Sequence, residues 1–293
     1  LEGSGTIAFP DNASGIVVNN ADGLLKIDGT GTLSAAKVTA TSNTGKGVQI
    51  VQSSTISNLE VSADTKLNIA GGETLSGSTE VAANKTLTLI GTGTLKSDLN
   101  LEGTLEAGAN LRVSGTINVA DNATVSIPAS GTTLTYSGGN LTVGAHTLEI
   151  GGAGTFRNAS FSPIVLAVED SVLDLTGNGI ISGPVRLDGG TLKASGSPTI
   201  SGVLTQSDNA TIEVASGQAL TYSGASLSLG ANKLTLSGGG TFNNSNAIKL
   251  DNETSLLSLE GIVTIGGVQA TDNATSGKGI QVVESATLGS FDL

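Results

Sequence analysis

The sequence predicts an all-β protein folded as a right-handed parallel β-helix, a solenoid of about 14 coils of about 21 residues each. Three observations support this prediction. A short phrase recurs along the chain at unequal intervals, apolar residues alternate with polar ones in short runs, and aromatic residues make up only 2% of the chain. Repeats at a short period are the sequence signature of stacked coils, in which each coil contacts only its neighbours.

The recurring phrase consists of a turn residue, an alternating apolar triplet, glycines, and then Thr followed by a large apolar residue. Its copies cover residues 83–95, 145–156 and 231–242. Asn84, His146 and Asn232 occupy the same position in these copies, and they lie 62 and 86 residues apart. These intervals are close to three and four multiples of about 21 residues, so stacked coils of that length explain both.

A longer period is also present. Residues 45–51 return as residues 277–283, an offset of 232, and residues 1–7 resemble residues 236–242. We therefore expect the chain to contain one long repeat unit and the start of the next repeat unit. We expect residues 1–293 to form a single continuous β-helix segment, an excerpt of a longer repetitive protein that begins inside a repeat, without an initiator Met or a signal peptide.

Short apolar triplets predict the strands. In Leu25-Lys26-Ile27 and Leu173-Asp174-Leu175 the apolar residues alternate with a polar one, which places one side inward and the other in solvent. Gly, Asn and Asp separate the triplets, where the chain must turn. We expect two or three strands per coil, stacked about 4.8 Å apart in parallel sheets. Right-handed winding follows from the preference of parallel crossovers.

Tandem β-sandwich domains are the alternative fold. A period of about 86 residues would suit an immunoglobulin-like module. Sandwich domains should repeat at one domain length, however, and the 62-residue interval departs from it. A sandwich of this kind also has large aromatic residues in its core, whereas this chain has no Trp.

Composition excludes several classes of function. The formal net charge of −12 argues against nucleic-acid binding, which depends on clustered Lys and Arg. There is no Cys, so disulfides, thiolate metal sites and Cys catalysis are excluded; this fits a secreted bacterial surface protein, but many cytosolic proteins also lack Cys. The longest apolar runs, such as residues 164–168, are too short to span a bilayer, so we expect no membrane insertion within this segment.

The degenerate coils, the Asp-Asn-Ala-Thr turns and the Gly-x-Gly-Thr-apolar endings resemble the β-helical repeat regions of large bacterial surface adhesins. Autotransporter passengers and filamentous-haemagglutinin-like adhesins are the types that the chain resembles, over essentially all 293 residues. The resemblance implies export, an extracellular location at the bacterial cell surface, and an adhesive or stalk-like role. The partner would be a receptor or glycan on a host or neighbouring cell.

Asparagines in turns are the candidate modification sites, because they match the Asn-x-Ser/Thr acceptor pattern. The five that we single out are Asn12, Asn122, Asn209, Asn252 and Asn273. Asn84, Asn140, Asn158 and Asn243 also match the pattern. The alternative interpretation is that these asparagines occupy left-handed turns or hydrogen-bonded ladders and carry no sugar.

No set of residues predicts catalysis, a metal site or a cofactor. His146 is the sole histidine, and its repeat equivalents are asparagines, so we interpret it as a turn residue. Tyr136 and Tyr222 are repeat equivalents, which favours a packing role. Asp174 and Asp188 are expected at scattered outward positions, with Arg186 and Asp188 close enough for an exposed ion pair. Calcium binding by turn aspartates and an ice-binding face of Thr pairs are weaker hypotheses.

The leading functional hypothesis is thus a structural or adhesive segment without enzymatic activity. The alternative is a polysaccharide-active enzyme, a lyase or a hydrolase, because some enzymes with β-helical folds cut acidic polysaccharides with grouped carboxylates. We also expect unpaired strand edges at both ends of the solenoid and therefore end-to-end self-association.

Overall fold

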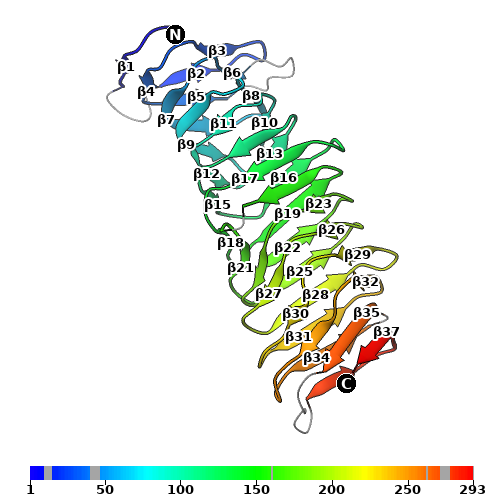
Figure 1. Ribbon diagram of the computed structural model, residues 1–293. Helices are drawn as coiled ribbons and strands as arrows, with labels where there is room; N and C mark the ends of the chain where they lie inside the picture. The colour runs from blue at the N-terminus through cyan, green and yellow to red at the C-terminus, as the bar shows by residue number, and fades with distance from the viewer. Residues whose placement is uncertain (10–14, 40–46, 160, 262, 271–277, 293) are drawn as a thin grey trace. The chain divides into compact units, whose positions relative to one another are not determined.

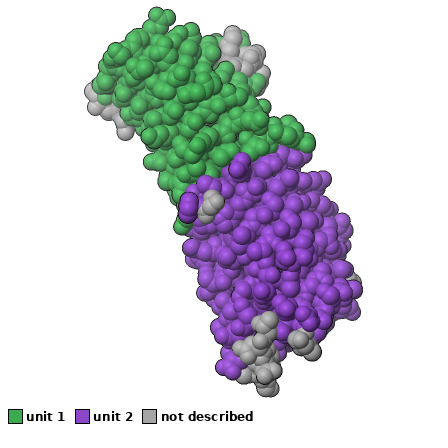
Figure 2. Space-filling model, in the orientation of Figure 1, with its two compact units in different colours: residues 1–141 green, residues 142–293 purple. Residues whose placement is uncertain are grey.

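The computed structural model describes residues 1–9, 15–39, 47–159, 161–261, 263–270 and 278–292. Two compact units make up the chain, Leu1–Leu141 and Thr142–Leu293, which Figure 2 shows in green and purple. Each unit is a parallel β-solenoid, and together they contain about 12 turns. The described residues include no helix long and apolar enough to cross a membrane. The predicted fold class is confirmed, and the expectation of one continuous segment stays a prediction.

Each coil passes through three rows of parallel strands. In the first unit, β3 (Leu24–Ile27) belongs to the first row, β4 (Thr32–Leu33) to the second row and β5 (Ala36–Val38) to the third row. The chain then returns to the first row as β6 (Gly47–Ile50), which pairs with β3 in parallel (Figure 1). Polar or glycine-containing turns separate the rows, because each apolar run is short.

The first row is the most regular. Its other strands in the first unit are β8 (Thr65–Ile69), β10 (Thr86–Leu89), β13 (Thr104–Ala107) and β16 (Ala123–Ile127). In the second unit they are β19 (Thr147–Gly152), β22 (Val172–Leu175), β25 (Thr191–Ala194), β28 (Ala210–Val214), β31 (Lys233–Ser237), β34 (Leu256–Glu260) and β36 (Gly279–Val282).

The second row follows the first along every coil. Its other strands in the first unit are β1 (Thr6–Ile7), β7 (Ser54–Val61), β9 (Thr74–Val81), β11 (Thr94–Leu95), β14 (Leu111–Val113) and β17 (Thr133–Tyr136). In the second unit they are β20 (Thr155–Asn158), β23 (Ile180–Ile181), β26 (Thr199–Ile200), β29 (Ala219–Tyr222), β32 (Thr241–Asn244), β35 (Val263–Ala270) and β37 (Ala286–Asp292).

The third row completes each coil. Its other strands are β2 (Ile16–Val18), β12 (Asp98–Leu101), β15 (Ile117–Val119), β18 (Leu141–Val143), β21 (Ile164–Leu166), β24 (Val185–Leu187), β27 (Leu204–Gln206), β30 (Leu227–Ser228) and β33 (Ile248–Leu250). Some strands run through both the second and the third row. β7, for example, pairs with β4 and with β5, and β35 pairs with β32 and with β33.

Coil length varies more than the sequence predicts. Leu87 pairs with Leu105 on the next coil, whereas Leu148 pairs with Leu173, so the second of these two coils is the longer by several residues. The estimate of about 14 coils of about 21 residues is therefore replaced by about 12 turns of unequal length. Pairing and inward packing constrain the strands, so the turns between rows absorb the differences in length.

The unequal intervals between the repeated phrases have the predicted explanation. Asn84, His146 and Asn232 precede β10, β19 and β31, respectively. In chain order β19 is the third first-row strand after β10, and β31 is the fourth after β19. The unequal intervals thus correspond to three and four coils.

Alternating side chains build a narrow aliphatic core. Leu25 and Ile27 point inward and are 6% and 5% exposed, while Lys26 between them is exposed. Four aromatic residues are completely buried, namely Tyr136, Tyr222, Phe156 and Phe242. The rings of Tyr222 and Phe242 stack across adjacent coils with centroids 6.3 Å apart. Core aromatics are therefore few and are concentrated in the second row.

Parallel pairing excludes the sandwich alternative. The pairs described for β3–β6, β10–β13 and β25–β28 are all parallel, and each joins segments one coil apart. An immunoglobulin-like sandwich consists of antiparallel sheets. The tandem-sandwich alternative is therefore wrong.

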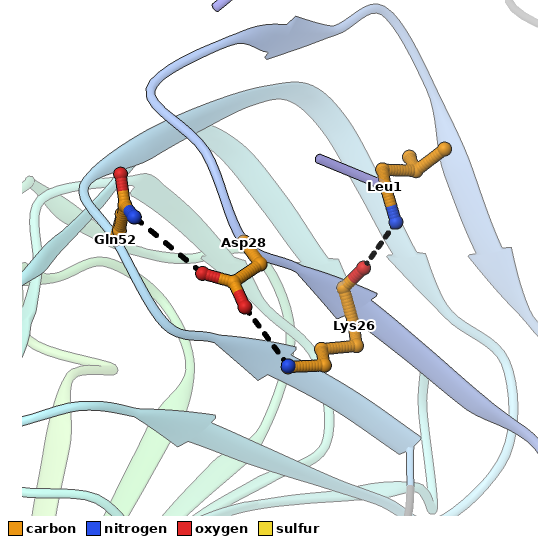
Figure 3. Close-up of polar contacts among 4 residues, drawn as sticks. All are labelled: Leu1, Lys26, Asp28 and Gln52. Atoms are coloured by element: carbon orange, nitrogen blue, oxygen red, sulfur yellow. Dashed lines mark hydrogen bonds and ion pairs between the residues drawn. The ribbon is translucent and has the colours of Figure 1, made fainter. Parts of the chain in front are cut away.

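Side chains also connect successive coils. At the start of the first unit, the Leu1 amino group donates to the carbonyl of Lys26 at 2.8 Å (Figure 3). Lys26 Nζ forms an ion pair with Asp28 at 2.9 Å, and Gln52 Nε2, one coil later, donates to the other Asp28 oxygen at 3.5 Å. The exposed ion pair adds little stability by itself, so the backbone ladders hold the coils together.

Candidate ligand-binding groove

A polar groove of about 700 Å³ lies in the second unit. Four successive coils line it. They contribute the turn at residues 167–169, the turn at residues 188–190, the turn at residues 208–209, and Lys233 with Thr235 of β31. The groove follows the first row, since Thr191 and Thr211 at the starts of β25 and β28 also line it.

Glycines allow the tight turn within the groove. Gly189 and Gly190 have φ angles of 130° and 62°, in the region that side-chain-bearing residues rarely adopt. A Cβ atom on Gly190 would lie 2.5 Å from the carbonyl oxygen of Ser171, one coil earlier. Two glycines therefore let the chain pass close to the preceding coil and keep this part of the groove open.

A column of threonines follows one side of the groove. Thr191 pairs in register with Thr211, and Thr211 with Thr235. All three side chains are partly exposed. Their hydroxyl groups have no hydrogen-bond partner in the part of the chain that the structure describes. Parallel strands lie about 4.8 Å apart, so the column offers three unused donor–acceptor groups at that spacing.

The charged groups of the groove differ in how they are paired. Glu169 is exposed and has no partner among the described residues. One Asp208 oxygen accepts a hydrogen bond from the Asn209 N–H at 2.7 Å. Lys233 Nζ is bound to Glu260 at 3.1 Å, and Asp188 is bound to Arg186 at 2.7 Å. The unpaired charge of the groove is therefore negative.

The ion pair predicted between Arg186 and Asp188 is confirmed. Arg186 Nε and Nη2 both lie 2.7 Å from Asp188 Oδ2, and the Ser207 hydroxyl donates to the other oxygen of Asp188. Asp174 lies elsewhere, on β22, and accepts a hydrogen bond from Ser195 Oγ at 3.0 Å. Of the two carboxylates singled out in the sequence, Asp188 alone lines the groove.

Three of the five candidate glycosylation sites lie within the described residues, and their environments differ. Asn209 is exposed and lines the groove, its Oδ1 accepting a hydrogen bond from Lys233 N at 2.7 Å. Asn122 is exposed next to Asp121. Asn252 is half-buried, and its Oδ1 binds both Thr254 N and Thr254 Oγ1. Asn12 and Asn273 lie outside the described residues. Whether any of them carries a sugar stays a prediction.

Asn158 and Asn244, which are repeat equivalents, have a structural role. Asn158 matches the acceptor pattern, but it is 4% exposed, and its Nδ2 donates to the carbonyls of Ser162 and Pro184. This amide nitrogen is therefore unavailable for glycosylation in the folded chain. Among the described non-glycine residues, Asn84 alone has a positive φ angle, 59°, so left-handed asparagine turns are rarer than the sequence suggests.

The other residues singled out in the sequence do not gather at the groove. His146 lies in the turn before β19, where its N–H donates to the carbonyl of Gly144 at 2.7 Å. Tyr136 and Tyr222 are buried in the core, as their repeat equivalence predicts. Within the described residues, no three carboxylate or imidazole groups lie close enough together to hold a metal ion.

The threonine column is the part of the site that sequence reasoning missed. A Thr precedes an inward Leu or Ile in β25 and β28, and this signal is visible in the sequence. Thr235 stands in the middle of β31, however, and its alignment with Thr211 depends on the length of the coil that joins them. Register was therefore needed to recognise the column.

Comparisons with protein-family models, curated proteins and solved structures found no match for this chain.

Proposed function

We propose that the chain is a structural and adhesive segment of a giant secreted or cell-surface bacterial protein, which mediates cell attachment or acts as a stalk. The observation that carries this proposal is the repeated outward face of the first row. Polar side chains stand in register on successive coils, as in Thr86–Thr104–Thr124 of the first unit and Thr191–Thr211–Thr235 of the second. Such a surface offers many equivalent contacts along the stack.

Three further features support this role. The resemblance of the coils to adhesin repeats covers essentially the whole chain. The net charge of −12 keeps such a protein soluble and away from anionic membrane surfaces. A solenoid can also extend by adding coils without needing a large core, because each coil is stabilised by its neighbours.

Bead attachment tests the proposal. Fluorescent beads coated with the 293-residue protein should bind to cells in a panel of bacterial and animal types, and beads coated with an acidic globular protein should not. Binding that free protein competes away would support attachment. If no cell type retains the beads, the proposed attachment function is wrong. The stalk role is then tested by inserting the segment beneath a surface-displayed tag, which should make that tag more accessible.

A polysaccharide-active enzyme is the alternative function. The same protein incubated with neutral and acidic polysaccharides should release neither reducing ends nor unsaturated sugars. Release of reducing ends or unsaturated sugars by the wild-type protein, lost when Asp188 or Asp208 is replaced, would contradict the structural and adhesive proposal.

A further inference from the structure

We propose that the groove of the second unit binds a neutral oligosaccharide, held by the threonine column and by Glu169. The proposal names the partner of the attachment function given above and rests on it. The argument begins with the shape of the site. Four coils line the groove, and three strand spacings of about 4.8 Å give it a length of about 14 Å, enough for about three sugar rings.

Unused hydrogen-bonding groups favour a polyhydroxylated ligand. The hydroxyls of Thr191, Thr211 and Thr235 each offer a donor and acceptors, and none is bound to a described residue. The Asn209 amide Nδ2 is likewise unused among the described residues, since its Oδ1 alone accepts a hydrogen bond. A chain of sugar hydroxyls at a similar spacing would satisfy these groups together, whereas an apolar ligand would leave them unpaired.

Charge selects among sugars. The Glu169 carboxylate is unpaired within the described chain, and the Lys233 ammonium is already bound to Glu260 at 3.1 Å. An acidic glycan or a phosphate would therefore meet uncompensated negative charge. Sugar hydroxyls can instead donate to the carboxylate, which forms stronger hydrogen bonds than a neutral acceptor. Val168, beside Glu169, is 44% exposed and provides an apolar contact for the C–H face of a ring.

Binding of defined oligosaccharides tests the proposal. The probes are neutral xylo-, manno- and chito-oligosaccharides of three to six rings, with oligogalacturonate and heparin fragments as acidic counterparts, measured by calorimetry on protein from a host that does not attach N-glycans. We expect at least one neutral series to bind and the acidic ones to bind more weakly. The Thr211→Val variant should weaken binding about fivefold, the equivalent of one lost neutral hydrogen bond. Glu169→Gln should weaken it about tenfold.

Matched variants separate the groove from general effects. Thr104→Val removes an outward hydroxyl from the same row in the first unit and should leave binding unchanged. Thr211→Ser should restore most of the affinity that Thr211→Val loses. Circular dichroism should show all variants folded.

Several results would overturn the proposal. These are the absence of binding by every neutral oligosaccharide, stronger binding of the acidic ones, or equal losses in Thr211→Val and Thr104→Val. Bead attachment that free Thr211→Val protein competes away as well as free wild-type protein does would remove this groove as the attachment site but leave the attachment function in place. Oligosaccharide binding without cell attachment would leave the groove as a sugar-binding site and remove the attachment function.

Discussion

At the scale of single residues, the two tyrosines show how the core accommodates polar groups. The Tyr136 hydroxyl accepts a hydrogen bond from Ile117 N at 3.4 Å, and the Tyr222 hydroxyl accepts one from Leu204 N at 3.1 Å. In both cases the donor lies on the preceding coil. Tyr222 also donates to the carbonyl of Ala225. The rings fill the core, and their hydroxyls bind the backbone N–H groups of Ile117 and Leu204, which lie in the core.

Alkaline pH should unfold the protein through these two residues. Burial raises the pKa of both phenols, and the hydrogen bonds from Ile117 N and Leu204 N lower it by less. An unfolded tyrosine titrates near about 10. The two buried tyrosines therefore contribute fully to the free energy of unfolding below that pH, and this contribution is lost as the pH rises through their pKa in the folded state. Tyrosinate absorbance should appear together with the loss of β-sheet circular dichroism, and the chain has no other Tyr and no Trp.

The Tyr222→Phe variant is the control for this titration. It keeps the ring, should remove half of the tyrosinate signal, and should lower the free energy of unfolding by about 1 kcal/mol because Leu204 N loses its partner. A tyrosinate signal that rises near about pH 10 while the sheet signal is unchanged would contradict the buried positions of the two rings.

At the scale of elements, buried asparagines hold the corner between the second and third rows. Asn244, at the end of β32, donates from Nδ2 to the carbonyls of Asn246 and Gly267 at 2.8 and 2.7 Å. Its Oδ1 accepts from Gly266 N at 2.8 Å and Gly267 N at 3.3 Å, one coil later. One side chain thus satisfies the backbone of two coils where the ladder of strands is interrupted.

The Asn244→Ala variant should destabilise the protein by about 3 kcal/mol, because it leaves several partly buried backbone groups without partners. Asn243→Ala is the matched control, since Asn243 is the adjacent residue and its side chain is exposed. Urea unfolding of both variants measures the difference. Equal stabilities would mean that the corner does not depend on the buried amide.

At the scale of the whole molecule, the first and last strands of the chain each pair with a neighbour in the stack. β1 pairs with β4, and β37 pairs with β35. Apolar side chains are exposed on both strands, with Ile7 41% and Phe291 47% exposed. A strand edge beside exposed apolar residues is a template for further pairing. End-to-end self-association of the 293-residue protein is therefore still our prediction.

Sedimentation velocity over a range of concentrations measures this association. The wild-type protein should form larger species as concentration rises, and Ile7→Lys or Phe291→Lys should shift it toward monomer, because charges at edges oppose pairing. Phe161→Lys is the matched control, because Phe161 is 92% exposed in the turn between β20 and β21, far along the chain from both strands. A wild-type protein that stays monomeric at high concentration would contradict the prediction, as would dissociation by Phe161→Lys.

Most of the fold could be predicted from the sequence, because inward and outward positions are local properties. Alternation in Leu25-Lys26-Ile27 and in Leu173-Asp174-Leu175 corresponds to alternating burial in β3 and β22. Ser258 shows the limit of this reasoning. It stands between Leu257 and Leu259 at an expected outward position, yet it is fully buried and donates to Glu260 at 2.8 Å.

The candidate site could be predicted only in part. Asp188 was singled out from the sequence as an outward carboxylate and Asn209 as a turn asparagine, and both line the groove. Glu169 and Lys233 carried no comparable signal, because Glu169 lies in a turn and Lys233 at the start of β31, and the two meet at the groove only when their coils stack. Asn158 matched the glycosylation pattern as well as Asn209 did, and burial alone separates the two.

The sequence by itself determined that the chain stacks short strands in repeated coils, since periodicity and composition act within one coil and its neighbours. The tertiary structure decided which residues of different coils meet. Unequal coil lengths set the register, and a change of register moves every side chain to a new neighbour. The threonine column, the groove and the buried asparagine corners depend on that register, because each joins groups on different coils that approach only when the coils stack.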